Sequence, residues 1–216
     1  MPRGDFARNL EFMQDSVVEM GSMVEKALFK SVDCLKRRDI DGSQEVVRDD
    51  DAIDEKQQSV EELCIELIAL EAPMAGDLRV IVSALLIVNE LERMGDYAEG
   101  IGKISISMGD LPPLKPLIDI PRMADKAGDM LRRSLKSYVK KDVNMALSVC
   151  EDDDEVDSMY EQVYRELLTY MMADPSTIER ATYLLWVAHD LERVADRTTN
   201  IAERVTYMVT GKSVDW

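Results

Sequence analysis

The chain has 216 residues, of which 26 are lysine or arginine and 43 are aspartate or glutamate, so its formal net charge is −17. This charge repels nucleic acid and anionic membranes, which excludes both as main partners, whereas cations and basic protein surfaces suit it. No stretch approaches the ~20 apolar residues of a membrane span, and the first residues, MPRGDFARNLEF, lack an apolar leader. We therefore expect a cytoplasmic protein with no membrane span.

Long segments with helical periodicity make up almost the whole chain, and strand-like alternation is nearly absent. Six long helices are predicted, at about 5–37, 42–71, 76–106, 120–140, 142–172 and 176–210. Residues 107–119 contain three prolines and form the one credible linker between two halves. The pattern predicts an all-α fold.

The third and sixth predicted helices carry the same narrow apolar stripe. From Val80 to Ile101, apolar residues recur alternately four and three positions apart, which is the heptad spacing of a left-handed helical bundle. The stripe recurs 100 residues later, and the segments NELERMGDYAEGI (89–101) and HDLERVADRTTNI (189–201) match. The helices before them match at an offset of 103. We predict two similar three-helix bundles in tandem, at 1–110 and 117–216.

Pairs of acidic residues four positions apart occur at corresponding places in both halves. Residues at this spacing share one face of a helix, where like charges are mildly destabilising, so four repeats of the pattern call for a reason. The pairs are Asp50 with Asp54, Glu92 with Asp96, Asp153 with Asp157, and Glu192 with Asp196.

The positions of these pairs are mirror-symmetric about the predicted turns. The pairs of the first half are equally distant from Pro73, and those of the second half are centred between Asp174 and Pro175. In an antiparallel hairpin, residues equally far from the turn lie at the same height. Each half should therefore gather four carboxylates, with Asp54 beside Glu92 in the first half. Glu92 and Asp96 lie on the side of the helix away from the apolar stripe, so we expect the carboxylates on the outside of the bundle.

Four close carboxylates repel one another unless a cation lies among them. Oxygen ligands without thiolates favour Mg²⁺, Ca²⁺, Mn²⁺ or iron, and zinc fits this ligand set less well. The alternative is a solvated acidic face, balanced by residues such as Arg48, Lys56, Arg93 or Arg193.

The chain has few cysteines and histidines, the residue types that most often act as nucleophiles or general bases in enzymes. It has three widely spaced cysteines and one histidine, and His189 is in neither a nucleophile motif nor a Glu-x-x-His motif. An exposed histidine is the simpler interpretation of His189, although it lies one turn from Glu192 and could add a nitrogen ligand. We expect a non-enzymatic protein. A carboxylate-bridged metal oxidase or phosphohydrolase, and a metal-free helical scaffold, remain as alternatives.

The motifs LERMGDYAEGI, LERVADRTTNIAE and APMAGDLRVI (72–81) resemble those of the PhoU proteins, accessory regulators of phosphate-specific transport, and the resemblance covers essentially the whole chain. It implies two three-helix bundles side by side and multinuclear iron or zinc clusters at the protein surface. The implied ligands are Asp50, Asp54, Glu92, Asp96, Asp153, Asp157, Glu192 and Asp196. Arg197 and Thr198 stand where many relatives carry His and Ala, so the two sites are expected to differ in metal content.

The resemblance also implies a role and partners. We expect a regulator that restrains phosphate uptake and phosphate-starvation signalling by contacting a phosphate transporter ATPase and a sensor histidine kinase. A homodimer is expected as well. From composition alone, an acidic helical surface can dock on a basic one, and bound metal would set the charge of that surface.

Overall fold

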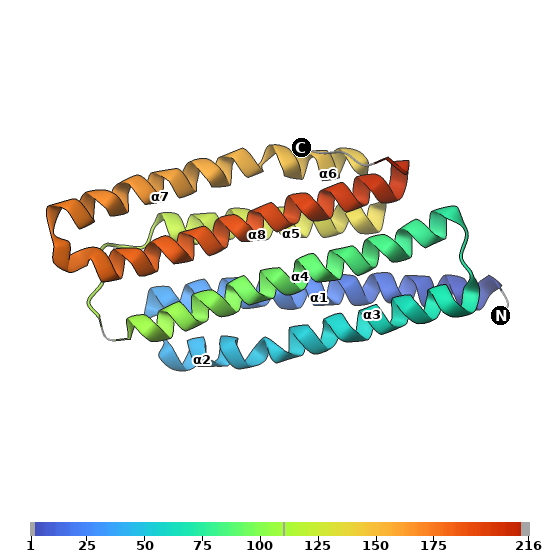
Figure 1. Cartoon of the computed structure of the whole chain (residues 1–216), viewed down its shortest axis with the longest axis horizontal. Coiled ribbons are helices and arrows are strands. Elements are labelled where there is room, and N and C mark those ends of the chain that lie inside the picture. The colour runs from blue at the N-terminus through green and yellow to red at the C-terminus, as the bar shows by residue number, and fades with distance from the viewer. Residues whose placement is uncertain (1–2, 110, 213–216) are drawn as a thin grey trace.

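Figure 1 shows the computed structural model of the chain, in which residues 3–109 and 111–212 are described. Within these residues the regular structure is entirely helical, as predicted. The elements are α1 (Arg3–Arg37), α2 (Ile40–Asp49), α3 (Asp51–Glu71), α4 (Ala75–Met108), α5 (Asp119–Lys140), α6 (Val143–Glu151), α7 (Asp153–Ala173), the 3₁₀ turn η1 (Pro175–Thr177) and α8 (Ile178–Thr210).

The helices form two similar three-helix bundles, which confirms the predicted fold. In the first bundle, α1 and α4 pack against α2 and α3, which follow each other as one rod with a break between them. In the second bundle, α5 and α8 pack against α6 and α7. The two bundles meet along α4 and α8, which run side by side, and along α1 and α5 (Figure 1). The apolar stripes predicted on α4 and α8 are buried in this core.

The predicted domain limits, 1–110 and 117–216, stay a prediction, and the limits at residues 1, 110 and 216 lie outside the described residues. One continuous hydrophobic core extends through both bundles. No helix within the described part of the chain is long and apolar enough to cross a membrane.

Two of the six predicted helices are interrupted. The helix predicted at 42–71 divides into α2 and α3 at Asp50, and the helix predicted at 142–172 divides into α6 and α7 at Asp152. Both residues keep right-handed helical dihedral angles, so the apolar periodicity continues across each break and does not reveal it. Runs of aspartate favour such breaks, because aspartate is a poor helix former and neighbouring charges repel.

The turns that begin α2 and α6 are copies of each other. Arg38 and Lys141, 103 residues apart, have left-handed backbone conformations that end the preceding helices. The next residue in each case is an aspartate whose side chain caps the new helix: Asp39 accepts a hydrogen bond from the backbone of Gly42, and Asp142 accepts one from Met145. The same local chemistry therefore orients α2 and α6 within their bundles.

Candidate metal centres

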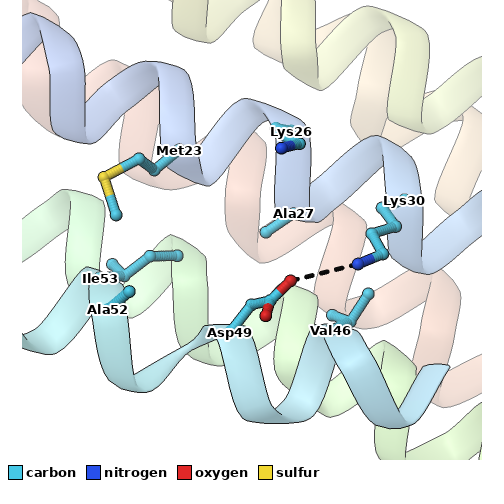
Figure 2. Close-up of a pocket in the computed structure, with 8 residues that line it drawn as sticks. All are labelled: Met23, Lys26, Ala27, Lys30, Val46, Asp49, Ala52 and Ile53. Carbon is cyan, nitrogen blue, oxygen red and sulfur yellow. Dashed lines mark hydrogen bonds and ion pairs between the residues drawn. The ribbon is translucent and has the colours of Figure 1, made fainter. Parts of the chain in front are cut away.

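The aspartates at the break between α2 and α3 point in different directions. Asp49 faces α1, where its Oδ2 accepts a hydrogen bond of 3.1 Å from Lys30 Nζ (Figure 2). Lys30 also pairs with Glu45 at 3.1 Å. A cavity of about 200 Å³ lies at this break, between α1 and the α2–α3 rod. Asp49 thus pairs with α1, whereas the next residue, Asp50, faces α4.

The second bundle repeats this arrangement 103 residues later. Asp152 accepts a hydrogen bond from Arg133 of α5, and its other oxygen lies 3.1 Å from Lys126 Nζ. Burial tends to raise the pKa of Asp152, but these two cations lower it overall. Arg133 thus takes the place of Lys30, and Asp153, the counterpart of Asp50, is directed toward α8.

Five carboxylates meet where the α2–α3 break approaches α4, and we call them the first cluster. One carboxylate oxygen from each of Asp50, Asp96 and Glu99 lies within 4.8 Å of the other two. Such convergence is the arrangement in which several carboxylates share a cation. The cluster lies at the protein surface, with Asp96 exposed and the others partly buried. Its members are Asp50, Asp54, Glu92, Asp96 and Glu99.

The acidic groups of the first cluster repel one another. Burial raises the pKa of Asp50 to about 7, and the charges of neighbouring carboxylates, Glu99 first, add to the rise. Burial followed by repulsion within the cluster also raises the pKa of Glu92 and of Asp96. A bound cation would relieve this repulsion, so the electrostatics of the cluster fit metal binding.

Gly95 allows Asp50 to approach α4 closely. A Cβ atom at this glycine would lie 3.0 Å from Asp50 Oδ1 and 3.2 Å from the side chain of Ile53. Both contacts are tight, so the side chains of Asp50 and Ile53 must shift by a few tenths of an ångström to make room for any larger residue here. The glycine that precedes Asp96 therefore helps to bring Asp50 and Asp96 together.

Four carboxylates meet at the corresponding place between the α6–α7 break and α8, and we call them the second cluster. Burial raises the pKa of Asp153 to about 6, and Asp196 makes the largest contribution among the neighbouring charges. The pKa of Asp157 is raised by burial and then by Glu192. Within the described structure, Asp153 Oδ1 is buried and has no hydrogen-bond partner. The second cluster comprises Asp153, Asp157, Glu192 and Asp196.

The surroundings of the second cluster differ from those of the first. In the described part of the chain, only the first cluster brings three ligand atoms within 4.8 Å of one another. In the second, Arg193 forms ion pairs with Glu192 and Asp196. A cavity of about 590 Å³ lies beside the cluster and is lined by Cys150, among others. Burial raises the pKa of the Cys150 thiol to about 11, so the thiol stays protonated at neutral pH in the metal-free protein.

The eight acidic residues singled out in the sequence lie in two groups of four, within each of which neighbouring carboxylates raise one another's pKa. Metal binding by them stays a prediction. Glu99 was missed, because the residue at its mirror position across the hairpin is Val47 and no acidic partner marked it. Its spacing of three from Asp96 on one helix face is the signal that could have found it. His189 is exposed and lies 3.5 Å from Asp190, outside the group of converging ligands.

Comparison with known proteins identifies the family of this chain. The family model of the PhoU domain matches twice, at residues 17–105 and 120–205, once in each bundle. The chain belongs to the PhoU family. A relative from Clostridium acetobutylicum, named a phosphate-specific transport system accessory protein PhoU homolog, is 37% identical over 216 residues, which is all of this chain and 99% of the relative. A protein of the same name from Aquifex aeolicus is 40% identical over 207 residues, covering 96% of this chain and 94% of the relative.

Solved PhoU structures share the fold. The crystal structure of PhoU from Pseudomonas aeruginosa superposes with a TM-score of 0.91 at 33% identity, covering 96% of this chain and all of the other. The phosphate transport system regulatory protein PhoU from Streptococcus pneumoniae also has a TM-score of 0.91, at 28% identity, over 98% of this chain. The PhoU architecture therefore extends over nearly the whole chain.

Proposed function

We propose that this chain is a non-enzymatic, metal-binding regulator of phosphate uptake and of phosphate-starvation signalling. The observation that carries the proposal is the match of both bundles to the PhoU domain, together with relatives named as accessory proteins of phosphate-specific transport. The chain acts in the cytoplasm, where it restrains a phosphate transporter ATPase and a sensor histidine kinase by direct contact.

The two clusters support the metal-binding part of this proposal. Carboxylate oxygens converge in the first cluster, and the pKa of Asp50 is raised to about 7 through burial and mutual repulsion. Asp50, Asp54, Glu92, Asp96 and Glu99 would hold iron or zinc there, and Asp153, Asp157, Glu192 and Asp196 would hold it in the second cluster. Other divalent ions such as Mg²⁺, Mn²⁺ or Ca²⁺ also suit these ligands.

Metal loading provides a physical means of regulation. Three divalent ions carry more positive charge than the five carboxylates of the first cluster carry negative charge, so loading them would change the sign of the surface offered to a partner. Ions bridging the α2–α3 break to α4 would also stiffen the bundle, because they tie separate helices together.

Exposed apolar side chains support contacts with other proteins. Met74 and Leu70, at the hairpin between α3 and α4, are 81% and 64% exposed, and Met172, at the end of α7, is 77% exposed. Trp186 of α8 is 53% exposed and meets Tyr183 edge to face. Large exposed apolar groups of this kind are typical of interaction surfaces, which suits partner binding and a homodimer.

The proposal is tested by comparing the natural chain with the double variant Glu92→Ala/Asp96→Ala. Cells lacking their own copy of the gene would express either protein, and phosphate uptake and captured partners would be measured at high and low phosphate. We expect the variant to lose metal from the first cluster, to keep its helicity and to release uptake from restraint. The control Glu62→Ala/Glu66→Ala removes two exposed acids with the same spacing on α3 and should behave as the natural protein.

Two outcomes would contradict the proposal. Unchanged metal content in Glu92→Ala/Asp96→Ala would remove its metal-binding part. Phosphate uptake that does not respond to deletion of the chain would remove its regulatory part. Oxygen consumption or phosphatase turnover that is lost in the double variant would instead favour the enzyme alternative.

A further inference from the structure

The side chain of Arg193 lies within the second cluster. Its Nε donates a hydrogen bond of 2.5 Å to Glu192 Oε2, and its Nη2 donates to the other oxygen of the same carboxylate. Its Nη1 lies 2.6 Å from Asp196 Oδ2. One guanidinium therefore holds two of the four carboxylates, in the bidentate geometry that makes arginine–carboxylate pairs strong.

The corresponding residue of the first cluster behaves differently. Arg93 lies 100 residues earlier at the equivalent position of the repeated motif, but it is exposed, and among the described residues no carboxylate lies within 4.0 Å of its guanidinium. Its charge acts on Glu92 and Asp96 from farther away, where it partly offsets the rise in their pKa. Among the described residues, the first cluster forms its ion pair with Lys103. Lys103 Nζ lies 2.5 Å from Glu99 Oε2, and the lysine side chain is 58% exposed. Asp50 and Asp96 are left without a cationic hydrogen-bond donor in the described structure, so their oxygens face each other and Glu99.

We propose that Arg193 is a built-in cation that occupies the second cluster, so that metal fills the first cluster first and enters the second only by displacing Arg193. This inference rests on the metal-binding part of the proposed function. A guanidinium stays protonated at every physiological pH, so proton loss cannot free the carboxylates. An entering metal ion must break the hydrogen bonds from Arg193 to Glu192 and Asp196. The net free energy of metal binding is therefore smaller than it would be at an unoccupied site.

The size of the effect follows from the bonds that must be broken. An entering metal ion breaks hydrogen bonds between Arg193 and the carboxylates. The loss of one or two such bonds between charged groups weakens metal binding by about tenfold to a hundredfold. Arg193 has room to leave, because its side chain is 36% exposed, whereas Glu192 is only 11% exposed and stays in place. The carboxylates thus remain positioned for metal after the arginine has moved outward.

The test measures zinc binding to the second cluster alone. The first cluster is disabled by Asp50→Asn/Asp96→Asn in the full-length chain, which is stripped of metal and titrated with ZnCl₂ by calorimetry, with metal content checked by elemental analysis. In this background, Arg193→Gln should tighten zinc binding by about tenfold or more. The matched control is Arg93→Gln with the second cluster disabled by Asp153→Asn/Asp196→Asn, where we expect a change below about threefold.

A second variant keeps the test decisive if Arg193→Gln folds poorly. Arg193→Lys retains the charge without the bidentate geometry, so zinc should bind with intermediate affinity, and circular dichroism would verify folding of each protein. Equal zinc affinity of the second cluster with Arg193 and with either substitution would overturn the inference and leave the proposed function intact. Failure of zinc to bind either cluster in every variant would overturn both.

Discussion

Replacing Asp50 with asparagine should stabilise the metal-free protein at neutral and alkaline pH. The carboxylate of Asp50 is partly buried among other acids, and its pKa is raised from 3.8 to about 7. Asparagine has nearly the same shape without the charge. Asp50 lies at the N-terminus of α3 but forms no capping hydrogen bond, so the substitution removes repulsion without removing a cap.

The magnitude follows from the linkage between proton binding and folding. The folded protein binds the Asp50 proton more tightly than the unfolded chain, so the penalty is absent below a pH of about 4, grows as pH rises, and is complete above about 7. At about 1.4 kcal/mol per pH unit, the full shift corresponds to about 4 kcal/mol. Part of the side chain contacts solvent, so we expect roughly half of this, about 2 kcal/mol, at pH 8 and below about 1 kcal/mol at pH 5.

Urea unfolding followed by circular dichroism, in the presence of a chelator, would measure this difference at pH 5 and pH 8. The control is Asp51→Asn, which alters the exposed neighbour and should change the free energy of unfolding by less than about 0.5 kcal/mol at either pH. A variant Asp50→Asn that is less stable than the natural protein at pH 8, or equally shifted at both pH values, would refute the assigned repulsion.

Three further predictions concern packing and metal. Gly95→Ala should weaken zinc binding to the first cluster in a calorimetric titration, because its Cβ would lie 3.0 Å from Asp50 Oδ1; unchanged affinity would contradict this role. Gly128→Ala should lower the free energy of unfolding in urea by about 1–2 kcal/mol, since its Cβ would lie 2.5 Å from the ring of Phe29; equal stability would show that α1 and α5 adjust freely. Zinc at a hundred times its dissociation constant should stabilise the natural protein by about 2.7 kcal/mol, and the gain should shrink in Asp50→Asn/Asp96→Asn.

Much of the fold could be predicted from periodicity. The six helical segments, the repeat and the apolar stripes of α4 and α8 follow from spacing, because a stripe on one helix face must be buried. The breaks at Asp50 and Asp152 could not be predicted this way. Both residues remain helical in dihedral angle, so the phase of the apolar pattern does not change there.

The pairing of acidic residues could also be predicted, since equal distance from a hairpin turn fixes their height. The height of a residue along the hairpin does not determine the direction in which its side chain points. Asp49 pairs with Lys30 of α1, whereas Asp50 faces α4, and both contacts depend on how α1 and α4 pack against the break. Glu99 joins the first cluster for the same reason, through proximity across helices rather than through symmetry.

Arg93 and Arg193 show most clearly what the repeated sequence does not determine. Arg93 and Arg193 follow the same Leu-Glu dipeptide, and the repeat makes them equivalent in the amino-acid order. In the folded chain Arg193 holds Glu192 and Asp196, whereas Arg93 is exposed to solvent. Helical spacing determines which face of its helix an acidic residue or an arginine occupies. Which charged side chains it then contacts depends on how the neighbouring helices pack. Spacing therefore predicts eight of the nine acidic residues in the two clusters, whereas Glu99 and the cation that balances each cluster depend on how the helices pack together.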